Sequence, residues 1–306
     1  MSLNPNRFFN SLRQNGIEFF SGVPDSLLKE FCLCIDDNVK NQNHLIAANE
    51  GNAIAISSGY HLATDKIPLV YMQNSGIGNA VNPLLSLCDK DVYSIPMLIL
   101  IGWRGEPGVK DEPQHKKQGK IQRKFLESMK IPYEIISTDY SKCKDQVNKA
   151  INSARNESMP YVLLIRKGTF SKYEKNSIEK FNTGVKREEI LEKILEQVDK
   201  NTIIVSTTGK TSREIFEIRE KKGDGHDKDF LTVGSMGHCS SIALGIAMSL
   251  PKRNILCIDG DGSMIMHLGA LTSIKSTFPP NFKHILINNK VHESVGGQST
   301  AAEHVN

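Results

Sequence analysis

Apolar and polar positions along the chain follow two alternating patterns. Strand-like apolar runs bounded by turn residues, typical of strands buried on both faces, occur at 17–21, 68–72, 96–101, 161–165, 202–206, 254–258 and 284–287. Between these runs apolar residues recur at helical spacing, as at Phe8, Phe9 and Leu12 and along residues 190–198, which predicts amphipathic helices. Strands that alternate with helices predict doubly wound α/β domains, each with a parallel sheet covered by helices on both faces.

A polar stretch at residues 167–184 interrupts this alternation, which then starts again. We therefore predict two domains, at 1–170 and 186–306, joined by a linker at 171–185. The length leaves no room for a third, middle domain. The second domain is the shorter, and the last 17 residues after Asn289 contain no further strand and helix pair. We expect the second domain to be incomplete at its C-terminal end.

Composition narrows the function classes. The 306 residues are 39% hydrophobic and 24% charged, which excludes collagen-like, disordered and disulfide-framework proteins. The net charge of +4 is too small to predict a nucleic-acid partner. Six scattered cysteines lack the spacing of a zinc site, and we predict that none is catalytic. Because the chain has no long apolar run and no signal-peptide core, we expect a soluble, cytoplasmic protein without a membrane partner.

The most specific candidate for a ligand-binding site lies at the ends of two successive predicted strands. Asp259-Gly-Asp-Gly-Ser263 follows one apolar strand, and Asn288-Asn289 follows the next. Ligands of parallel sheets bind at the carboxyl ends of the strands, and carboxylate and amide oxygens suit Mg²⁺. A calcium EF-hand loop beginning at Asp259 would need glutamate at its twelfth position, where Ala270 stands. A plain Asp-Gly turn is the remaining alternative, and the Asn-Asn pair disfavours it.

This pairing resembles the signature of the thiamine diphosphate-dependent enzymes. The resemblance implies that Mg²⁺ is held by the side chains of Asp261 and Asn289 and by the backbone carbonyl of Val291. It also implies a set of neighbours around the cofactor's diphosphate: Asp259, Gly260, Gly262, Ser263 and Asn288.

The first domain contains further segments that resemble this family. Ala48-Asn-Glu-Gly-Asn-Ala53 resembles the segment of the activating glutamate, so the resemblance implies that Glu50 contacts the cofactor's pyrimidine and helps to remove the thiazolium proton. The turn with Gly76 and Gly78 resembles the family's glycine-rich cofactor contact. Taken alone, these residues also fit an exposed helix-start glutamate and a partial dinucleotide-binding fingerprint, which would indicate a dehydrogenase.

Two segments of the second domain complete the family pattern. Residues 207–212 resemble the diphosphate-side loop and include Thr208 and Gly209; a P-loop would require glycine at Ile204. Residues 233–241 resemble the segment whose apolar residue lies between the two cofactor rings. This implies a cofactor contact at Ser235 and the wedging role for Met236, which could otherwise be a core methionine.

Within the family, the chain looks like the two-domain phosphonopyruvate decarboxylases. Segments 21–26, 103–119 and 295–299 carry this closer resemblance, which covers nearly the whole chain. It implies non-oxidative decarboxylation of a small 2-keto acid, 3-phosphonopyruvate, to phosphonoacetaldehyde and CO₂ in organic phosphonate biosynthesis. It also implies active sites shared between two subunits, hence at least a homodimer.

The polar segment 103–120 predicts a loop that closes over a dianionic substrate, because it is rich in basic residues and follows an apolar strand. Arg104 and His115 are our candidates for the phosphonate contact, while Asp25 and Ser26 would lie near the cofactor if the family pattern holds. Sulfopyruvate decarboxylase and a non-catalytic subunit of the same fold are the alternative functions. One departure is Lys290, at a position where the family often has glycine.

Overall fold

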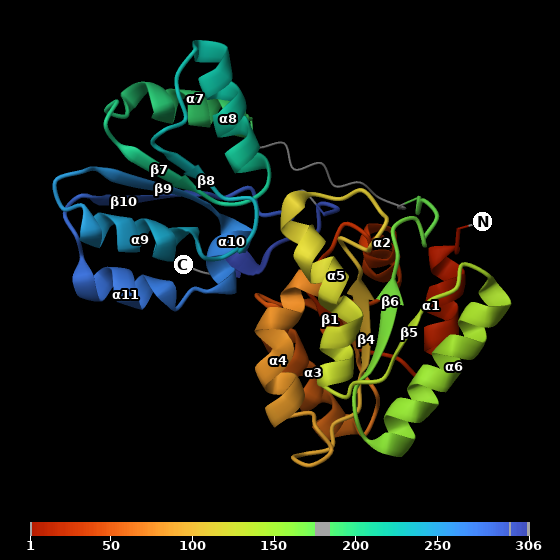
Figure 1. Ribbon diagram of the computed structural model, residues 1–306. Helices are drawn as coiled ribbons and strands as arrows, with labels where there is room; N and C mark the ends of the chain where they lie inside the picture. Colours follow the sequence, from red (N-terminus) through yellow and green to blue (C-terminus); the bar gives the residue numbers. More distant parts are fainter. Residues whose placement is uncertain (1, 175–183, 294, 305–306) are drawn as a thin grey trace. The chain divides into compact units, whose positions relative to one another are not determined.

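The computed structural model describes residues 2–174, 184–293 and 295–304. The chain divides into two compact units (Figure 1), one made of Met1–Ile178 with Val295–Gln298 and the other of Glu179–Ser294 with Ser299–Asn306. Most of the predicted linker, residues 175–183, lies outside the described residues. Each unit holds one parallel sheet, and no third sheet occurs among the described residues. The predicted fold class of two parallel-sheet α/β domains is therefore confirmed, whereas the exact domain bounds stay a prediction.

In its described residues, the first unit carries a six-stranded sheet in the order β2-β1-β3-β4-β6-β5, with every pair parallel. The strands are β1 (Phe20–Gly22), β2 (His44–Ile46), β3 (Leu69–Gln73), β4 (Leu98–Gly102), β5 (Tyr133–Ile135) and β6 (Tyr161–Ile165). The helices are α1 (Pro5–Gln14), α2 (Lys29–Asn38), α3 (Glu50–Thr64), α4 (Ile77–Ser86), α5 (Pro113–Ser128) and α6 (Tyr140–Glu157), with short 3-10 helices η1 (Asn41–Asn43) and η2 (Asn74–Gly76).

Alternate residues of the central strands pack against different helices. Leu98 and Leu100 of β4 belong to an apolar cluster with α1, α2 and α6. Ile99 and Ile101 belong to a second cluster with α3, α4 and α5. Because successive side chains of a strand point to opposite faces, a strand covered by helices on both faces must be apolar throughout. This explains the continuous apolar runs of the sequence.

The second unit repeats this architecture on a smaller scale. Its described residues form a four-stranded parallel sheet in the order β10-β9-β7-β8. The strands are β7 (Ile203–Ser206), β8 (Asp229–Leu231), β9 (Ile255–Gly260) and β10 (Phe282–Ile287); the helices are α7 (Arg187–Gln197), α8 (Lys210–Lys222), α9 (Cys239–Ser249), α10 (Asp261–Met266), α11 (Ala270–Thr277) and the 3-10 helix η3 (Ala301–His304). Leu256 and Ile258 belong to a cluster with two helices, α7 and α8, whereas Ile255 and Cys257 belong to a cluster with one helix, α9.

The prediction of a loop at residues 103–120 is wrong beyond residue 112. The sequence favoured a loop over residues 103–120, but α5 begins at Pro113. Glu112 is extended and Pro113 occupies the start of the helix, where its missing N–H would have no helical partner in any case. His115 therefore lies in the first turn of a helix and not in a loop.

The described residues contain no helix long and apolar enough to cross a membrane. All six cysteines are free and buried. Buried, free cysteines of this kind behave as small apolar packing residues.

Candidate active-site residues in the two units

Glu50 is the first residue of α3 and is nearly buried, with 4% of its surface exposed. Asn49 caps the helix, since its side chain accepts a hydrogen bond from the Asn52 backbone N–H at 2.9 Å. Asn79 Nδ2 donates to Glu50 Oε2 at 2.8 Å. Burial raises the pKa of the Glu50 carboxyl group, and the hydrogen bond from Asn79 only partly opposes it. The carboxyl group is therefore suited to hold a proton and to exchange it with a partner.

The two predicted glycines near Glu50 differ in their surroundings. A Cβ atom at Gly76 would overlap the Glu50 carboxyl group, whereas one at Gly78 would have no neighbour within 4 Å. Gly76 thus makes room for the acid, and Gly78 does not.

Asp25 lies beside a second predicted residue, Ser26, and its side chain is completely buried. Gln73 Nε2 donates to it at 2.7 Å and the Leu27 backbone N–H at 2.9 Å. Burial raises the pKa of Asp25, against the lowering effect of these hydrogen bonds. A Cβ at Gly102, where β4 ends, would overlap this carboxylate. Asp25 is therefore packed against the carboxyl edge of the sheet.

Arg104 already has partners for its guanidinium group. Its Nε and Nη2 donate to the two oxygens of Asp111, and Nη1 donates to Ser26 Oγ at 2.8 Å. The hydrogen bonds from Arg104 hold the pKa of Asp111 well below its ordinary value. The structure thus brings Arg104 and Ser26 together, and a phosphonate would have to compete with Asp111 for the arginine. Burial lowers the pKa of nearby His115, whose buried Nδ1 has no hydrogen-bond partner among the described residues.

The second unit places its predicted acids where β9 ends and α10 begins. Asp261 is the first residue of α10 and is 4% exposed; Thr300 Oγ1 donates to its Oδ2 at 2.6 Å. Asp259, at the end of β9, is completely buried. Burial raises the pKa of Asp259, but His284, Cys239, Ser263 and the Gly260 N–H outweigh burial and lower it.

The loop after β10 supplies the remaining candidate metal ligands. The Asn289 side chain accepts a hydrogen bond from the Val291 backbone N–H at 3.2 Å, and the Asn288 side chain accepts one from Lys290 at 3.1 Å. Lys290 has φ 61°, in the left-handed region that favours glycine. This conformation explains why glycine suits the position. Among the described residues no group of three or more His, Cys, Asp or Glu could hold a metal, so a metal here would depend on amide, backbone, water and phosphate oxygens beside Asp261.

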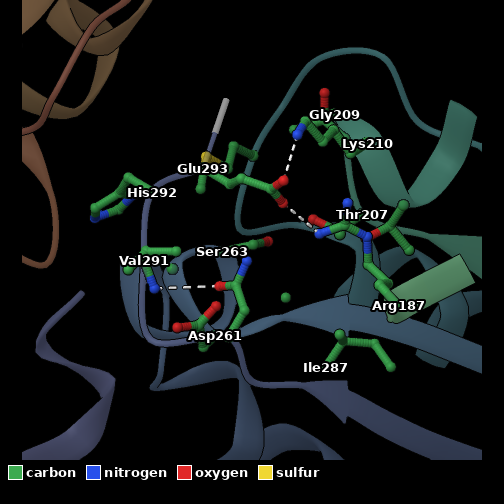
Figure 2. A pocket seen from close by; sticks show the side chains of 16 residues that line it. Arg187, Thr207, Gly209, Lys210, Asp261, Ser263, Ile287, Val291, His292 and Glu293 are labelled. Carbon is green, nitrogen blue, oxygen red and sulfur yellow. Dashed lines mark hydrogen bonds and ion pairs between the residues drawn. The ribbon is translucent and has the colours of Figure 1, made fainter. Parts of the chain in front are cut away.

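One pocket of the second unit brings together most of the site residues that were predicted for that unit (Figure 2). Three predicted residues, Ser235, Asp259 and Asn288, do not line it. Those that do are Thr208, Gly209, Met236, Gly260, Asp261, Gly262, Ser263, Asn289 and Val291.

Turn geometry explains the Met236 segment. Ser235 and Gly237 have φ 55° and 91°, and the Gly237 N–H donates to Ser263 Oγ at 3.0 Å. Met236 is thereby held at the pocket with 36% of its surface exposed.

Several residues of this pocket are not among those predicted from the sequence. Arg187, Lys210, His292 and Glu293 line it, and Thr300 binds Asp261. Lys210 stood inside the motif at 207–212 and could have been selected for its charge. Arg187 gave no such signal, because it starts a helix far from every motif.

Comparisons with known proteins agree with these observations. Residues 6–127 match the N-terminal TPP binding domain of thiamine pyrophosphate enzymes, and residues 208–306 match the C-terminal TPP binding domain. Phosphonopyruvate decarboxylases of Streptomyces viridochromogenes and Streptomyces hygroscopicus are 31% and 30% identical to the chain, over 95% of the chain and 74% of each relative. A sulfopyruvate decarboxylase of Methanosarcina acetivorans is 26% identical over 95% of the chain and 77% of that relative.

Proposed function

The chain belongs to the phosphonopyruvate decarboxylase family of thiamine pyrophosphate enzymes, and on this premise we propose that it converts 3-phosphonopyruvate into phosphonoacetaldehyde and CO₂. It is a thiamine pyrophosphate-dependent decarboxylase, a carboxy-lyase, of the phosphonopyruvate or sulfopyruvate type. The observation that carries the choice of substrate is the higher identity, over the same share of the chain, to relatives named for phosphonopyruvate. The same reaction places the protein in the biosynthesis of organic phosphonates.

The donor set of the second unit fits Mg²⁺ together with a diphosphate. Asp261 and Asn289 line one pocket with the first turn of α8 and the cations Arg187 and Lys210. Backbone N–H groups at a helix start and basic side chains favour a phosphate group. The Asp261 carboxylate, the Asn289 amide oxygen and the Val291 carbonyl would hold Mg²⁺, with water and phosphate oxygens as its other ligands.

In the first unit, Glu50 would contact the pyrimidine ring of the cofactor. When bound, thiamine pyrophosphate supplies a ring that accepts the electron pair left by the departing CO₂. Glu50, whose burial favours its protonated form, would exchange a proton with the pyrimidine. Asn79 fixes one oxygen of this carboxyl group, so the acid is oriented before the cofactor arrives.

The proposed acid and the proposed metal ligands belong to different units of the chain. By the family resemblance, each active site would join the first unit of one subunit to the second unit of another. We therefore include a homo-oligomer, at least a dimer, in the proposed function.

The test is CO₂ release from 3-phosphonopyruvate and, separately, from sulfopyruvate, with and without thiamine pyrophosphate and Mg²⁺. We expect release from 3-phosphonopyruvate that depends on both cofactors and exceeds release from sulfopyruvate. Preference for sulfopyruvate would favour the second candidate, which the sulfopyruvate decarboxylase relative supports. No release from either acid, together with no cofactor binding by calorimetry, would indicate a non-catalytic subunit.

A further inference from the structure

The loop that follows β10 sends an acidic side chain into the pocket of the second unit. Figure 2 shows the Glu293 carboxylate between two cations that come from different helices. Arg187, the first residue of α7, donates from Nη1 to Glu293 Oε2 at 2.8 Å. Lys210, the first residue of α8, donates from Nζ to Oε1. All three residues line the pocket that contains Asp261 and Asn289.

The two cations are held in different ways. Glu214 binds Arg187 through two hydrogen bonds of 2.7 Å, from Nε and Nη2, which fixes the guanidinium and leaves Nη1 for Glu293. For Lys210, Glu293 is the carboxylate within ion-pair distance in the part of the chain that the structure describes. The side chains of Lys210 and Glu293 are 45% and 40% exposed. Ion pairs with such exposure contribute little to stability, so a ligand with more negative charge can replace this carboxylate.

The surroundings of the Glu293 carboxylate suit a phosphate group. Gly209, with φ 95°, precedes the first turn of α8, and Gly209, Lys210 and Thr211 line the pocket. The N-terminus of a helix attracts anions through its unpaired N–H groups and its dipole. A carboxylate with one charge therefore occupies a place built for an oxyanion.

We propose that Glu293 acts as an internal anion that occupies Arg187 and Lys210 until the diphosphate of the cofactor displaces it. The inference rests on the proposed function, because it assigns the displacing ligand to the cofactor of that reaction. In the free protein the Glu293 carboxylate reduces the repulsion between Arg187 and Lys210. Because the cofactor has to displace it, Glu293 lowers the affinity for the cofactor. Glu293 and the proposed ligands Asn289 and Val291 lie in one loop, so the displacement takes place next to the proposed metal site.

The experiment is calorimetric titration of the full chain with inorganic diphosphate and Mg²⁺ at pH 7.5, which needs no turnover. Glu293→Gln keeps the size of the side chain and removes its charge. We expect it to bind diphosphate about two- to thirtyfold more tightly than the unaltered chain, the factor that corresponds to the two ion pairs that Glu293 forms with Arg187 and Lys210. The gain should shrink as salt is raised, because salt screens exposed charges.

Three further variants make the result specific. Lys210→Met should weaken diphosphate binding, and in the double variant the gain from Glu293→Gln should be smaller, since Glu293 then competes with the ligand only at Arg187. Glu196→Gln is the matched control: Glu196 forms an exposed ion pair with Lys222 and does not line the pocket. It should leave the affinity unchanged.

Equal or weaker binding by a folded Glu293→Gln chain would overturn the inference and assign Glu293 to positioning the two cations. Absence of diphosphate binding in both chains would overturn it as well. Failure of the proposed function appears differently, as lack of CO₂ release by a chain that still binds diphosphate.

Discussion

Glu50 and Asp261 occupy corresponding places in the two units. Each is the first residue of a helix that follows a parallel strand, and each is 4% exposed. Each accepts one side-chain hydrogen bond, Glu50 from Asn79 and Asp261 from Thr300. The surroundings then differ. Glu50 packs against Gly76, whereas Asp261 shares a pocket with Arg187 and Lys210.

This difference separates two chemical tasks that the same backbone position can serve. A buried carboxyl group with few hydrogen-bond donors around it, such as Glu50, has a raised pKa, because burial favours its protonated form. A carboxylate that shares a pocket with cations and oxygen ligands can bind a metal and its phosphate counterpart. The proposed reaction needs both, one acid in each unit.

The largest effects are expected when each of the two acids is neutralised in turn. Glu50→Gln should lower turnover by about 10²- to 10⁴-fold, the usual contribution of a general acid or base, while cofactor affinity stays within a few-fold. Asp261→Asn should instead lose cofactor affinity, because it weakens the proposed metal site. Steady-state CO₂ release and calorimetry with thiamine pyrophosphate measure the two effects separately.

Glu18→Gln is a suitable control, since Glu18 belongs to the first unit and forms an exposed ion pair with Lys66. It should change neither quantity. If Glu50→Gln and Asp261→Asn gave the same pattern of losses, the division of tasks between the units would be wrong.

A smaller effect is expected from the space around Glu50. Gly76→Ala places a methyl group against the carboxyl group and should lower the free energy of unfolding by about 1–3 kcal/mol, the usual cost of overpacking a buried site. Gly78→Ala has open space and lies in α4, where alanine is favoured by up to about 1 kcal/mol. Urea unfolding of the cofactor-free chains compares the two. Equal effects of the two substitutions would show that Gly76 has no special relation to Glu50.

The sequence predicted the central strands better than the edges of the sheets. The runs at 68–72, 96–101 and 161–165 became β3, β4 and β6, because strands covered on both faces must be apolar. The missed strands β2, β5 and β8 have three residues each, and all lie at sheet edges with no buried residue. An edge strand needs no continuous apolar run, so its pattern resembles that of a loop.

Some residues of the candidate site could likewise be predicted from the sequence and others could not. Glu50, Asp261 and Asn289 could be selected because each stands in a short motif next to a predicted strand or helix end. Arg187 and Glu293 are 106 residues apart, and their ion pair arises only when α7 and the loop after β10 pack into one unit. No local pattern predicts such a pair.

The smallest expected effect is the pH dependence that Glu50 gives to stability, since it comes from one proton on one side chain. Burial raises the pKa of Glu50 in the folded chain, while in the unfolded chain the pKa of Glu50 is about 4.3. Between these two values the folded chain binds more protons than the unfolded chain, so the free energy of unfolding falls as pH rises. The contribution of Glu50 is fully present below the unfolded pKa and is lost as pH passes through the folded pKa.

Because many groups titrate, the measurement is the difference between the unaltered chain and Glu50→Gln, by urea unfolding of the cofactor-free chains at pH values from 4 to 8. The stability of the unaltered chain relative to the variant should decrease with rising pH and then level off. A difference that stays constant would mean that Glu50 titrates alike in the folded and unfolded chains, and a difference that increases would mean that the folded chain prefers the carboxylate. In either case burial would not favour the protonated form of Glu50, and its proposed role in proton exchange would lose this support.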